Sequence, residues 1–528
     1  MTVDYQAKYA DNVSERSKNR FINTFYSFDI PEGIVKHANP ISLGGGTPNE
    51  GFFPVESIHL NLIDEPFQHL SYEKKSPLTN KTDINVKEQI HELTNAASTY
   101  RYTENPAEEV SIARGFQYGE TDGFPQIKKF ARDLIEETNK PAYNDWDVIV
   151  ANGSGDSLHK VADLFVDKGS TVLVEDFTFT PFNTGVANLG GVNIPVKINF
   201  KNVDNDPDFD YGVDVAFLED LLDNWGADEA HYKGLSKPKS FYCIPTGQNP
   251  TGVTQSQEKR KQVYAICEKH NIIIIEDDPY GYIVLPKYSK GGANPYASPD
   301  FSIEKYKKEF LRPSYLQIDT SGRVIRLETF SKLFAPGLRL GFIVANKYLI
   351  QRIFVHTALS TRQPSGVSQL VFNSIVKQWG GVNGWIKWAS KIAKHYTERR
   401  DVLLTELYDT EAYKKGLFSI VEPDAGMFII LFVNFDKIIT DPKKWDNAFT
   451  QMKYLSLKYG VDVVYGNKMA SNLDKDFSLE KSNFLRITIA AANDNAQLVE
   501  AAKRLSDTFI EFFEKLEAGE FNAALDAE

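Results

Sequence analysis

The segment RVIRLETFSKLFAPGLRLG, residues 323–341, joins two apolar stretches through a turn of small residues. Its first part, RVIRLETF (323–330), is predicted to be a β-strand. The turn that follows holds Lys332 and, seven positions later, Arg339. A lysine in a partly desolvated crevice has a lowered pKa, which an amine needs in order to form a Schiff base, and the planar guanidinium of an arginine suits a phosphate. Taken alone, a solvated surface lysine fits the same position, so the rest of the chain has to decide.

Strands and helices alternate on the N-terminal side of this segment. The spacing in FPQIKKFARDLIEET predicts a helix whose apolar face is formed by Ile127, Phe130, Leu134 and Ile135. DVIVANGSGDSL and STVLVEDFTFTPF each begin with a predicted strand, and SFYCIP (240–245) and IIIIED (272–277) are two more. The last two runs are almost continuously apolar, which indicates strands buried on both faces. The alternation predicts an α/β fold with a mostly parallel central sheet flanked by helices.

The texture of the chain changes after about residue 370. Long helical patterns such as WIKWASKIAKHYTERRDVLLTELY are followed by the strands MFIILFV and NFLRITIA and by a final helix over 494–515. We therefore predict an N-terminal arm (1–50), a large domain (51–369) and a smaller α+β domain (370–528). The stretches 198–239 and 286–314 are expected to be loops or insertions.

Composition excludes several classes of protein. The 528 residues are 42% hydrophobic and 25% charged, and no apolar run approaches the roughly 18 residues that span a bilayer. The net charge of −12 opposes binding to nucleic acids or acidic lipids. Only two isolated cysteines, Cys243 and Cys267, occur, which argues against a disulfide framework. The first residues mix acids with bases and lack the apolar core of a secretory signal, so we expect a cytoplasmic protein.

Unusual residues gather where the predicted strands end. In an open parallel sheet, ligands bind outside the carboxyl ends of the strands. Gly153-Ser154-Gly155 follows one strand and precedes a helix, so its amides and the helix dipole can hold a phosphate, although such turns also occur as plain connections. PTGQNPTG (245–252) follows the next strand. It either fixes Asn249 in a rigid loop or is simply a tight turn.

Two further predicted strands carry charged residues where the chain is expected to be buried. EDDPY (276–280) closes the isoleucine run, and a carboxylate buried there needs a cationic partner unless it is solvated at the strand end. Arg486 lies inside the apolar segment NFLRITIA, where it faces either an anion or solvent at a sheet edge. The sequence has no GxxxxGK[ST], HExxH or GxSxG motif and no spaced set of His and Cys ligands, so we predict no metal site.

Taken in this order, the motifs PTGQNPTG, IIIIEDDPYGY, RVIRLETFSKLFAPGLRLG and FLRITIA resemble those of the fold-type-I pyridoxal-phosphate aminotransferases. Within that family the chain is similar to the group that holds the fungal aromatic amino acid aminotransferases and the kynurenine/aminoadipate aminotransferases. It is most similar to the larger, catabolic fungal enzymes. The resemblance runs from Leu43 to Ala490, and it implies pyridoxal 5′-phosphate as the cofactor.

The resemblance implies roles for individual residues. Lys332 would form the Schiff base with the cofactor and then move a proton between the substrate α-carbon and the cofactor. Asp277 would keep the pyridinium nitrogen protonated, so that the ring can accept electrons. Asp277 is chosen over Asp278 because the family places a phenol three residues later, and Tyr280 meets that spacing. Asn249 and Tyr280 would hold the phenolic oxygen.

The remaining roles concern the phosphate, the ring face and the substrate. The predicted phosphate ligands are Ser154, Gly155, Ser331 and Arg339. Phe179 would cover the ring, and Tyr118 would reach the phosphate of the neighbouring subunit, which implies a homodimer with shared active sites. Arg486 would clamp the substrate α-carboxylate with a two-pronged hydrogen bond, close to Asn249 and Gly46.

Two positions depart from the family pattern. Thr329 stands where relatives often carry serine, which keeps a hydroxyl and adds a methyl group. Asp156 follows Gly155, and an acid beside a phosphate site is unfavourable unless its side chain points away.

The function that follows is transamination of phenylalanine, tyrosine and tryptophan with a 2-oxo acid, in two half-reactions through pyridoxamine phosphate. A 2-aminoadipate or kynurenine aminotransferase is the nearest alternative, and a decarboxylase or β-lyase on the same fold would also keep Lys332 and Asp277. A cofactor-binding transcriptional regulator is a distant alternative, because the approximately 40 residues before Leu43 are too few for a winged helix-turn-helix.

Overall fold

A computed structural model describes residues 3–22, 33, 48–67, 72–74, 84–86 and 96–525. Its centre is a seven-stranded sheet in the order β5-β13-β12-β11-β10-β6-β7. Within this sheet only β13 is antiparallel to its neighbours. The strands are β5 (Trp146–Ala151), β6 (Thr171–Glu175), β7 (Val192–Val196), β10 (Ser240–Cys243), β11 (Ile273–Asp277), β12 (Val324–Thr329) and β13 (Gly341–Asn346). The predicted α/β fold with a mostly parallel sheet is confirmed.

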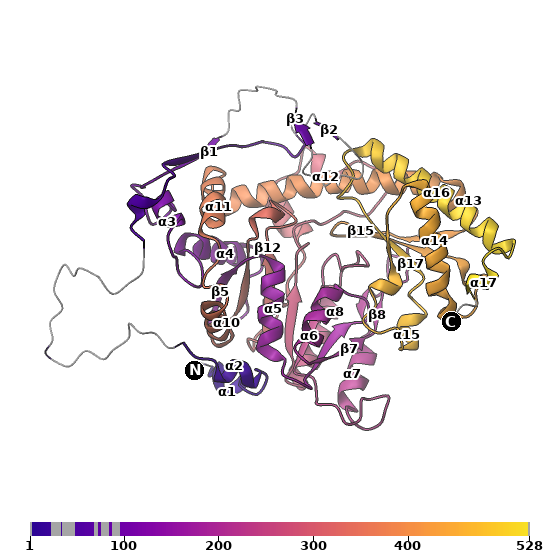
Figure 1. Ribbon diagram of the computed structural model, residues 1–528, viewed down its shortest axis with the longest axis horizontal. Coiled ribbons are helices and arrows are strands. Elements are labelled where there is room, and N and C mark those ends of the chain that lie inside the picture. Colours follow the sequence, from indigo (N-terminus) through magenta and orange to yellow (C-terminus); the bar gives the residue numbers. More distant parts are fainter. Residues whose placement is uncertain are drawn as a thin grey trace.

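Helices flank this sheet in two groups, as Figure 1 shows. One group is α5 (Ser154–Phe165) with α6 (Thr180–Asn188) and α10 (Lys347–Leu359), and the other is α4 (Pro125–Thr138) with α11 (Gly366–Gln378) and α12 (Val382–Asp409). α8 (Gln257–Lys269) packs beside β11. The predicted apolar face of α4 is buried, because residues spaced three and four apart share one side of a helix.

A second, smaller sheet lies in the C-terminal part and is antiparallel, with the order β14-β15-β17-β16. Its strands are β14 (Phe418–Val421), β15 (Phe428–Val433), β16 (Val464–Tyr465) and β17 (Phe484–Thr488). The helices around it are α13 (Glu411–Lys414), α14 (Trp445–Tyr459), α15 (Asp476–Leu479), α16 (Asn495–Glu517) and α17 (Asn522–Leu525). The predicted α+β texture after residue 370 is therefore present.

The N-terminal helices α1 (Tyr5–Tyr9) and α2 (Glu15–Asn19) lie beside α10, far from the C-terminal helices (Figure 1). The Tyr9 hydroxyl donates to the carbonyl oxygen of Ser321 at 2.6 Å, and Asn12 donates to that of Asn271 at 2.7 Å. Further on are β1 (Ser57–Asn61), paired with β4 (Ala96–Tyr100), then β2 (Tyr72–Lys74), paired with β3 (Ile84–Val86), and α3 (Ile112–Gly115).

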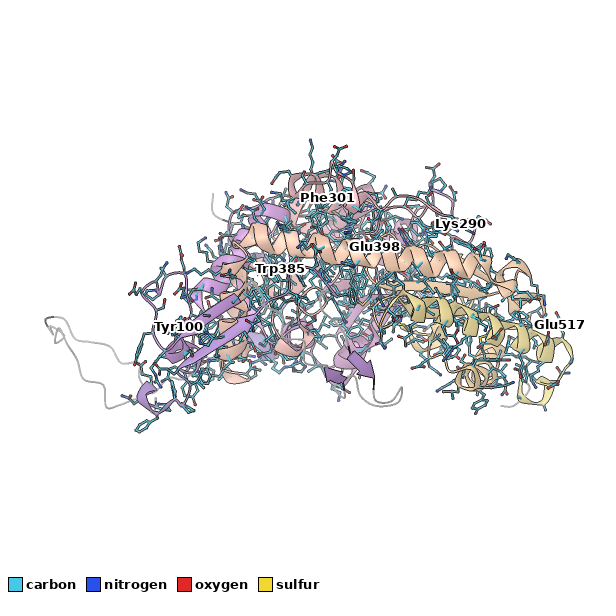
Figure 2. The ribbon with its side chains drawn as sticks, turned by 90° about the horizontal axis from the view of Figure 1, so that it is seen from above. Tyr100, Lys290, Phe301, Trp385, Glu398 and Glu517 are labelled. Atoms are coloured by element: carbon cyan, nitrogen blue, oxygen red, sulfur yellow. The ribbon has the colours of Figure 1, made fainter. Side chains whose placement is uncertain are left out.

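The two expected insertions contain more structure than loops. Residues 198–239 include the pair β8 (Ile198–Asn199) and β9 (Gly212–Val213) and a capped helix, α7 (Val215–Asp223), which corrects the loop prediction. The helix was not predicted because the sequence before α7 is acidic and irregular, although the buried leucines of α7 recur at helical spacing. Residues 286–314 form short helical turns that pack along α12, and Figure 2 shows Lys290 and Phe301 of this segment on one side of that helix.

Two exclusions from composition can be checked against the structure. In the described part of the chain, no helix combines the length and apolar character needed to cross a bilayer. Cys243 and Cys267 are both buried and free. The same described residues include no cluster of His, Cys, Asp or Glu that could hold a metal ion.

Candidate active site

The predicted site residues follow the carboxyl ends of strands that all point the same way. Ser154 follows β5, Phe179 follows β6, Asn249 follows β10 and Tyr280 follows β11, while Lys332 follows β12. Since β13 alone runs in the opposite direction, its start lies at this edge too, and Arg339 immediately precedes it. The topology therefore brings these side chains to a single edge, as expected for an open α/β sheet.

Lys332 lies in the turn that leaves β12. Burial is the largest cause that lowers the pKa of its amine, and the nearby guanidinium groups of Arg339 and Arg486 lower it further. The carboxylate of Asp277 acts in the opposite direction and raises it. Lys332 is exposed by its solvent-accessible surface, but the protein packed around the amine is dense enough for desolvation to be the largest cause. More of the amine is consequently neutral, and hence nucleophilic, near neutral pH than for an ordinary lysine.

Asp277 ends β11 and is buried, with the Tyr242 hydroxyl donating to its Oδ2 at 2.7 Å. Burial raises the pKa of this carboxyl from 3.8 to about 7, and the Tyr242 hydrogen bond only partly opposes that shift. No arginine, lysine or histidine pairs with Asp277 within the described ranges. A buried carboxylate in this condition gains most from a cationic or N–H-bearing partner supplied by a ligand.

Asp278, the alternative weighed from sequence, is already neutralised. Its Oδ2 accepts a hydrogen bond from Arg326 at 2.6 Å, and the same guanidinium bonds to Glu276 at 2.9 Å. Successive residues of a strand point to opposite faces, so Asp277 faces away from this Arg326 cluster. The geometry favours Asp277 as the partner of a ligand, although its role stays a prediction.

A cradle for an anion lies between β5 and the β12 turn. Gly153 has a positive φ of 81°, and a Cβ there would lie 2.4 Å from Nη2 of Arg339, so only glycine lets this guanidinium approach the start of α5. The hydroxyl of Thr329 donates to Ser331 Oγ at 2.9 Å, and Arg339 Nη1 reaches the same oxygen at 3.4 Å. Thr329, the first departure from the family pattern, thus orients Ser331. The helix dipole, a hydroxyl and a guanidinium together suit a phosphate.

Asp156, the second departure, turns away from this cradle. Its Oδ2 accepts hydrogen bonds from the backbone N–H of Asn152 at 2.9 Å and from Lys160 Nζ at 2.6 Å. The Lys160 side chain is itself buried, so the pair is internal to the first turns of α5. The acid therefore leaves the anion cradle free of unfavourable charge.

Arg486 is held on β17 by two neighbours. Its Nη1 donates to Oδ1 of Asn249 at 2.7 Å, and its guanidinium lies over the ring of Phe428 at 4.2 Å. Desolvation lowers the pKa of this arginine, and within the described residues no carboxylate forms an ion pair with it. A partly buried guanidinium without an anion is suited to bind the carboxylate of a substrate.

Tyr280 and Phe179 are the remaining predicted residues that follow strands at this edge of the sheet. Tyr280 is buried, its ring meets that of Phe428 edge-on at 5.9 Å, and burial followed by the charge of Asp277 raises its pKa. Phe179 is half-buried and caps the start of α6.

Two predicted residues are not brought together with the others. Tyr118 is 62% exposed, and its backbone contacts Arg114 and Gln117 rather than any site residue of the same chain. Gly46 lies outside the described residues. Sequence reasoning missed Tyr242 and Phe428, since one looks like a strand aromatic in SFYCIP and the other like core in MFIILFV.

The residues present fit pyridoxal phosphate. The cradle of Arg339, Ser331 and the α5 amides suits its phosphate, the unpaired carboxyl of Asp277 suits its ring nitrogen, and Lys332 supplies an amine that feels the charges of both Arg339 and Asp277. Arg486, whose charge also acts on the amine, leaves one more anion-binding group for a substrate.

Comparison with known proteins gives a consistent picture. The family model described as Aminotransferase class I and II matches residues 80–505. Aromatic amino acid aminotransferase 2 of Saccharomyces cerevisiae is 40% identical over 97% of this chain and 98% of its own length. The mitochondrial kynurenine/alpha-aminoadipate aminotransferase of Rattus norvegicus is 29% identical over 71% of this chain and 80% of its own.

A solved structure matches the fold over almost the whole chain. The crystal structure of the aromatic aminotransferase Aro9 from C. albicans superimposes with a TM-score of 0.82 at 40% sequence identity. The match covers 96% of this chain and 98% of that one.

Proposed function

Because this chain belongs to the class I and II aminotransferases, we propose that it transfers the amino group of phenylalanine, tyrosine and tryptophan to a 2-oxo acid. Its cofactor is pyridoxal phosphate, as the family and the fit of the site imply. The fold is the type I fold of these enzymes. The 40% sequence identity with aromatic aminotransferases, which extends over nearly the whole chain, supports the substrate class.

One observation supports transamination most directly. Besides burial, the charges of Arg339 and Arg486 both lower the pKa of Lys332, and neither guanidinium has an acidic partner in the part of the chain that the structure describes. Two unpaired guanidinium groups near a desolvated amine suit a cofactor and a substrate that each carry one anionic group. A phosphate and an α-carboxylate meet that requirement.

The residues divide the work of the reaction. Bound pyridoxal phosphate supplies a carbonyl that condenses with amines and a ring that accepts electron density. Lys332 Nζ, whose pKa is lowered by burial, takes the proton from the α-carbon of the substrate and later returns one. Asp277 holds the ring-nitrogen proton, and Tyr280 with Asn249 lines the space around the ring oxygen.

The phosphate and the substrate carboxylate set the orientation of this chemistry. Ser154, Gly155, Ser331 and Arg339 hold the phosphate, and Phe179 covers the ring face. Arg486 clamps the α-carboxylate, with Asn249 fixing its Nη1. The cofactor is held by its phosphate and the substrate by its α-carboxylate. The substrate therefore presents its α-hydrogen to Lys332 with little loss of entropy in the reaction step.

A second candidate is kynurenine or 2-aminoadipate transamination, favoured by the similarity to the rat kynurenine/alpha-aminoadipate enzyme. Purified enzyme loaded with pyridoxal phosphate is given phenylalanine, tryptophan, kynurenine or 2-aminoadipate with 2-oxoglutarate, and the oxo acid products are measured. We expect kcat/KM for phenylalanine and tryptophan to exceed that for 2-aminoadipate by about tenfold or more. Release of carbon dioxide, or of a β-elimination product, in place of the oxo acid would contradict transamination.

We also propose a cytoplasmic homodimer in which Tyr118 contributes to the partner's phosphate site. Exposed aromatic side chains support this assembly, because Phe52, Tyr100, Tyr102 and Tyr118 are each more than half exposed on neighbouring N-terminal segments. Sedimentation of the purified chain tests the dimer. The division into an arm (1–50), a large domain (51–369) and a small domain (370–528) remains part of this proposal.

A further inference from the structure

One helix contacts both the turn that carries Lys332 and the chain just beyond the strand that carries Arg486. This helix, α12, is 28 residues long and uninterrupted. Figure 2 shows it as a single rod, with Trp385 near one end and Glu398 farther along. An unbroken α-helix of this length is stiff compared with the loops that carry the site residues.

The first contact is made by Trp388. Its indole Nε1–H donates to the backbone carbonyl oxygen of Leu333 at 2.8 Å, and Leu333 immediately follows Lys332. On the same side of the turn, the rings of Phe330 and Phe334 lie 5.1 and 6.0 Å from that of Trp385. The turn that presents the amine is thus tied to α12 by one hydrogen bond and by aromatic packing before and after the lysine.

The second contact is made by Arg399, eleven residues farther along α12. Its Nε donates to the carbonyl oxygen of Ile489 at 2.6 Å, and its Nη2 donates to that of Ala492 at 2.5 Å. Ile489 is three residues beyond Arg486 and directly follows β17. The Arg399 side chain is buried, so these bonds form away from bulk water.

We propose that Trp388 and Arg399 are positioning residues through which α12 fixes the separation between the Lys332 amine and the Arg486 guanidinium. Eleven residues of helix separate the two contacts by about 16 Å along the axis. The amine and the carboxylate clamp lie on different sheets, and this rod joins their supports directly. The inference rests on the proposed function and deepens it, because the position of the amine relative to the guanidinium decides whether an amino acid bound through its carboxylate presents its α-carbon to Lys332.

The first experiment measures Lys332 without using activity. Ligand-free wild type, W388F and W445F are acetylated over a range of pH, and peptide mass spectrometry gives the pKa of Lys332 in each. W388F removes the indole N–H from Leu333, while W445F removes an equivalent bond from Trp445 to the carbonyl of Ile439, in the small sheet domain. We expect the pKa of Lys332 to rise toward its ordinary value in W388F only, since a looser turn admits water.

The second experiment measures the clamp. The affinity of the loaded enzyme for 3-phenylpropionate, which has the carboxylate and ring of phenylalanine but no amine, is determined for the wild type, R399M and R352M. Arg352 also donates to backbone carbonyls, those of Ser17 and Arg20, far from the site. We expect R399M to raise the Kd by up to about 100-fold and R352M to leave it unchanged. R399K, which keeps the positive charge and a single donor nitrogen, should recover part of the affinity and serves if R399M fails to fold.

The outcomes separate this inference from the proposed function. If the wild type does not bind 3-phenylpropionate, the aromatic substrate class is wrong, and the Lys332 titration, which needs no substrate, still decides the inference. An unchanged Lys332 pKa in folded W388F, or an unchanged Kd in folded R399M or R399K, would overturn the positioning role.

Discussion

Two groups of charged residues lie close together near the end of β11, and they differ in one respect. In the Arg326 cluster, a buried guanidinium bonds to Glu276 at 2.9 Å, to Asp278 at 2.6 Å and to Glu328 at 2.7 Å. In the candidate site, Asp277 has only a tyrosine hydroxyl as its partner, and the Arg339 and Arg486 side chains have no acidic partner in the described chain.

The difference separates charges that are paired within the fold from charges that have no oppositely charged partner in the described chain, and we propose that the second group binds a ligand. Burying an unpaired charge is costly, and a fold keeps one only where something else compensates for it. Glu276, Asp277 and Asp278 are consecutive, yet the alternation of the strand sends Asp277 alone to the ligand side. Pairing, more than burial, distinguishes the site from its support.

The largest expected effect is on turnover. Lys332→Ala should lower kcat for phenylalanine by about 10⁴-fold or more, since the variant loses both the nucleophile and the proton carrier. Stopped assays of phenylpyruvate formation measure the loss. The exposed Lys347→Ala is the matched control and should retain full activity. Appreciable turnover in Lys332→Ala would remove the lysine from the mechanism.

Substitution of Arg326 should instead lower the free energy of unfolding. Arg326→Met leaves three buried carboxylates without their common cation, so we expect a loss near the upper end of about 3–5 kcal/mol in the free energy of unfolding. Urea unfolding of the ligand-free protein provides the measurement. A loss below about 1 kcal/mol would mean that this cluster is not structural and that the comparison between the two groups does not hold.

Substitution of Asp277, in contrast to that of Arg326, should raise the free energy of unfolding, by an amount that depends on pH. The pKa of Asp277 rises from 3.8 in the unfolded chain to about 7 in the fold, so between these values the folded chain keeps a proton that the unfolded chain has lost. The stability contributed by this group therefore falls as pH rises. Relative to the ligand-free wild type, Asp277→Asn should gain up to about 4 kcal/mol between pH 4 and pH 7.

Urea titrations of both proteins across this pH range test the prediction, with the exposed Asp300→Asn as the control. A stability difference that does not change with pH would show that Asp277 is not held as an unpaired carboxyl. Saturation with pyridoxal phosphate should shrink the gain, because the ring nitrogen then supplies the missing partner.

The smallest of these effects concerns the clamp. Arg486→Lys keeps the positive charge but loses the two-pronged geometry, so KM for phenylalanine should rise about 10- to 100-fold with a smaller change in kcat. Initial rates at saturating 2-oxoglutarate measure both constants. Arg504→Lys, on the exposed face of α16, should change neither. A fall in kcat alone would indicate that Arg486 does not bind the carboxylate.

Much of the fold could be predicted because its strands are unusually apolar. Runs such as Ile272–Ile275 admit few alternatives to a doubly covered strand, and the spacing of Ile127 to Ile135 predicts α4. Helix α7 was missed although Asp214 caps it and Leu218, Leu221 and Leu222 are buried on one side. The acidic stretch before it outweighed a short periodic signal.

Prediction of the site was strongest where local order determines it. Asp277 ends a strand and Asn249 and Lys332 follow strands, so the parallel topology brings them to one edge of the sheet. Trp388 and Phe428 could not be found in this way, because their contacts with the Lys332 turn and with Arg486 join segments about 55 residues or more apart. Such long-range contacts become visible only when the chain is folded.

The most direct test of the central claim is to find where the cofactor attaches. The purified enzyme is loaded with pyridoxal phosphate and reduced with borohydride, and the digested peptides are analysed by mass spectrometry. If the unpaired charges at the sheet edge form the cofactor site, the phosphopyridoxyl group will be found on Lys332, and Asp277→Asn or Arg339→Met will weaken loading. Labelling of any other lysine in the native protein, with Lys332 unmodified, would contradict the account.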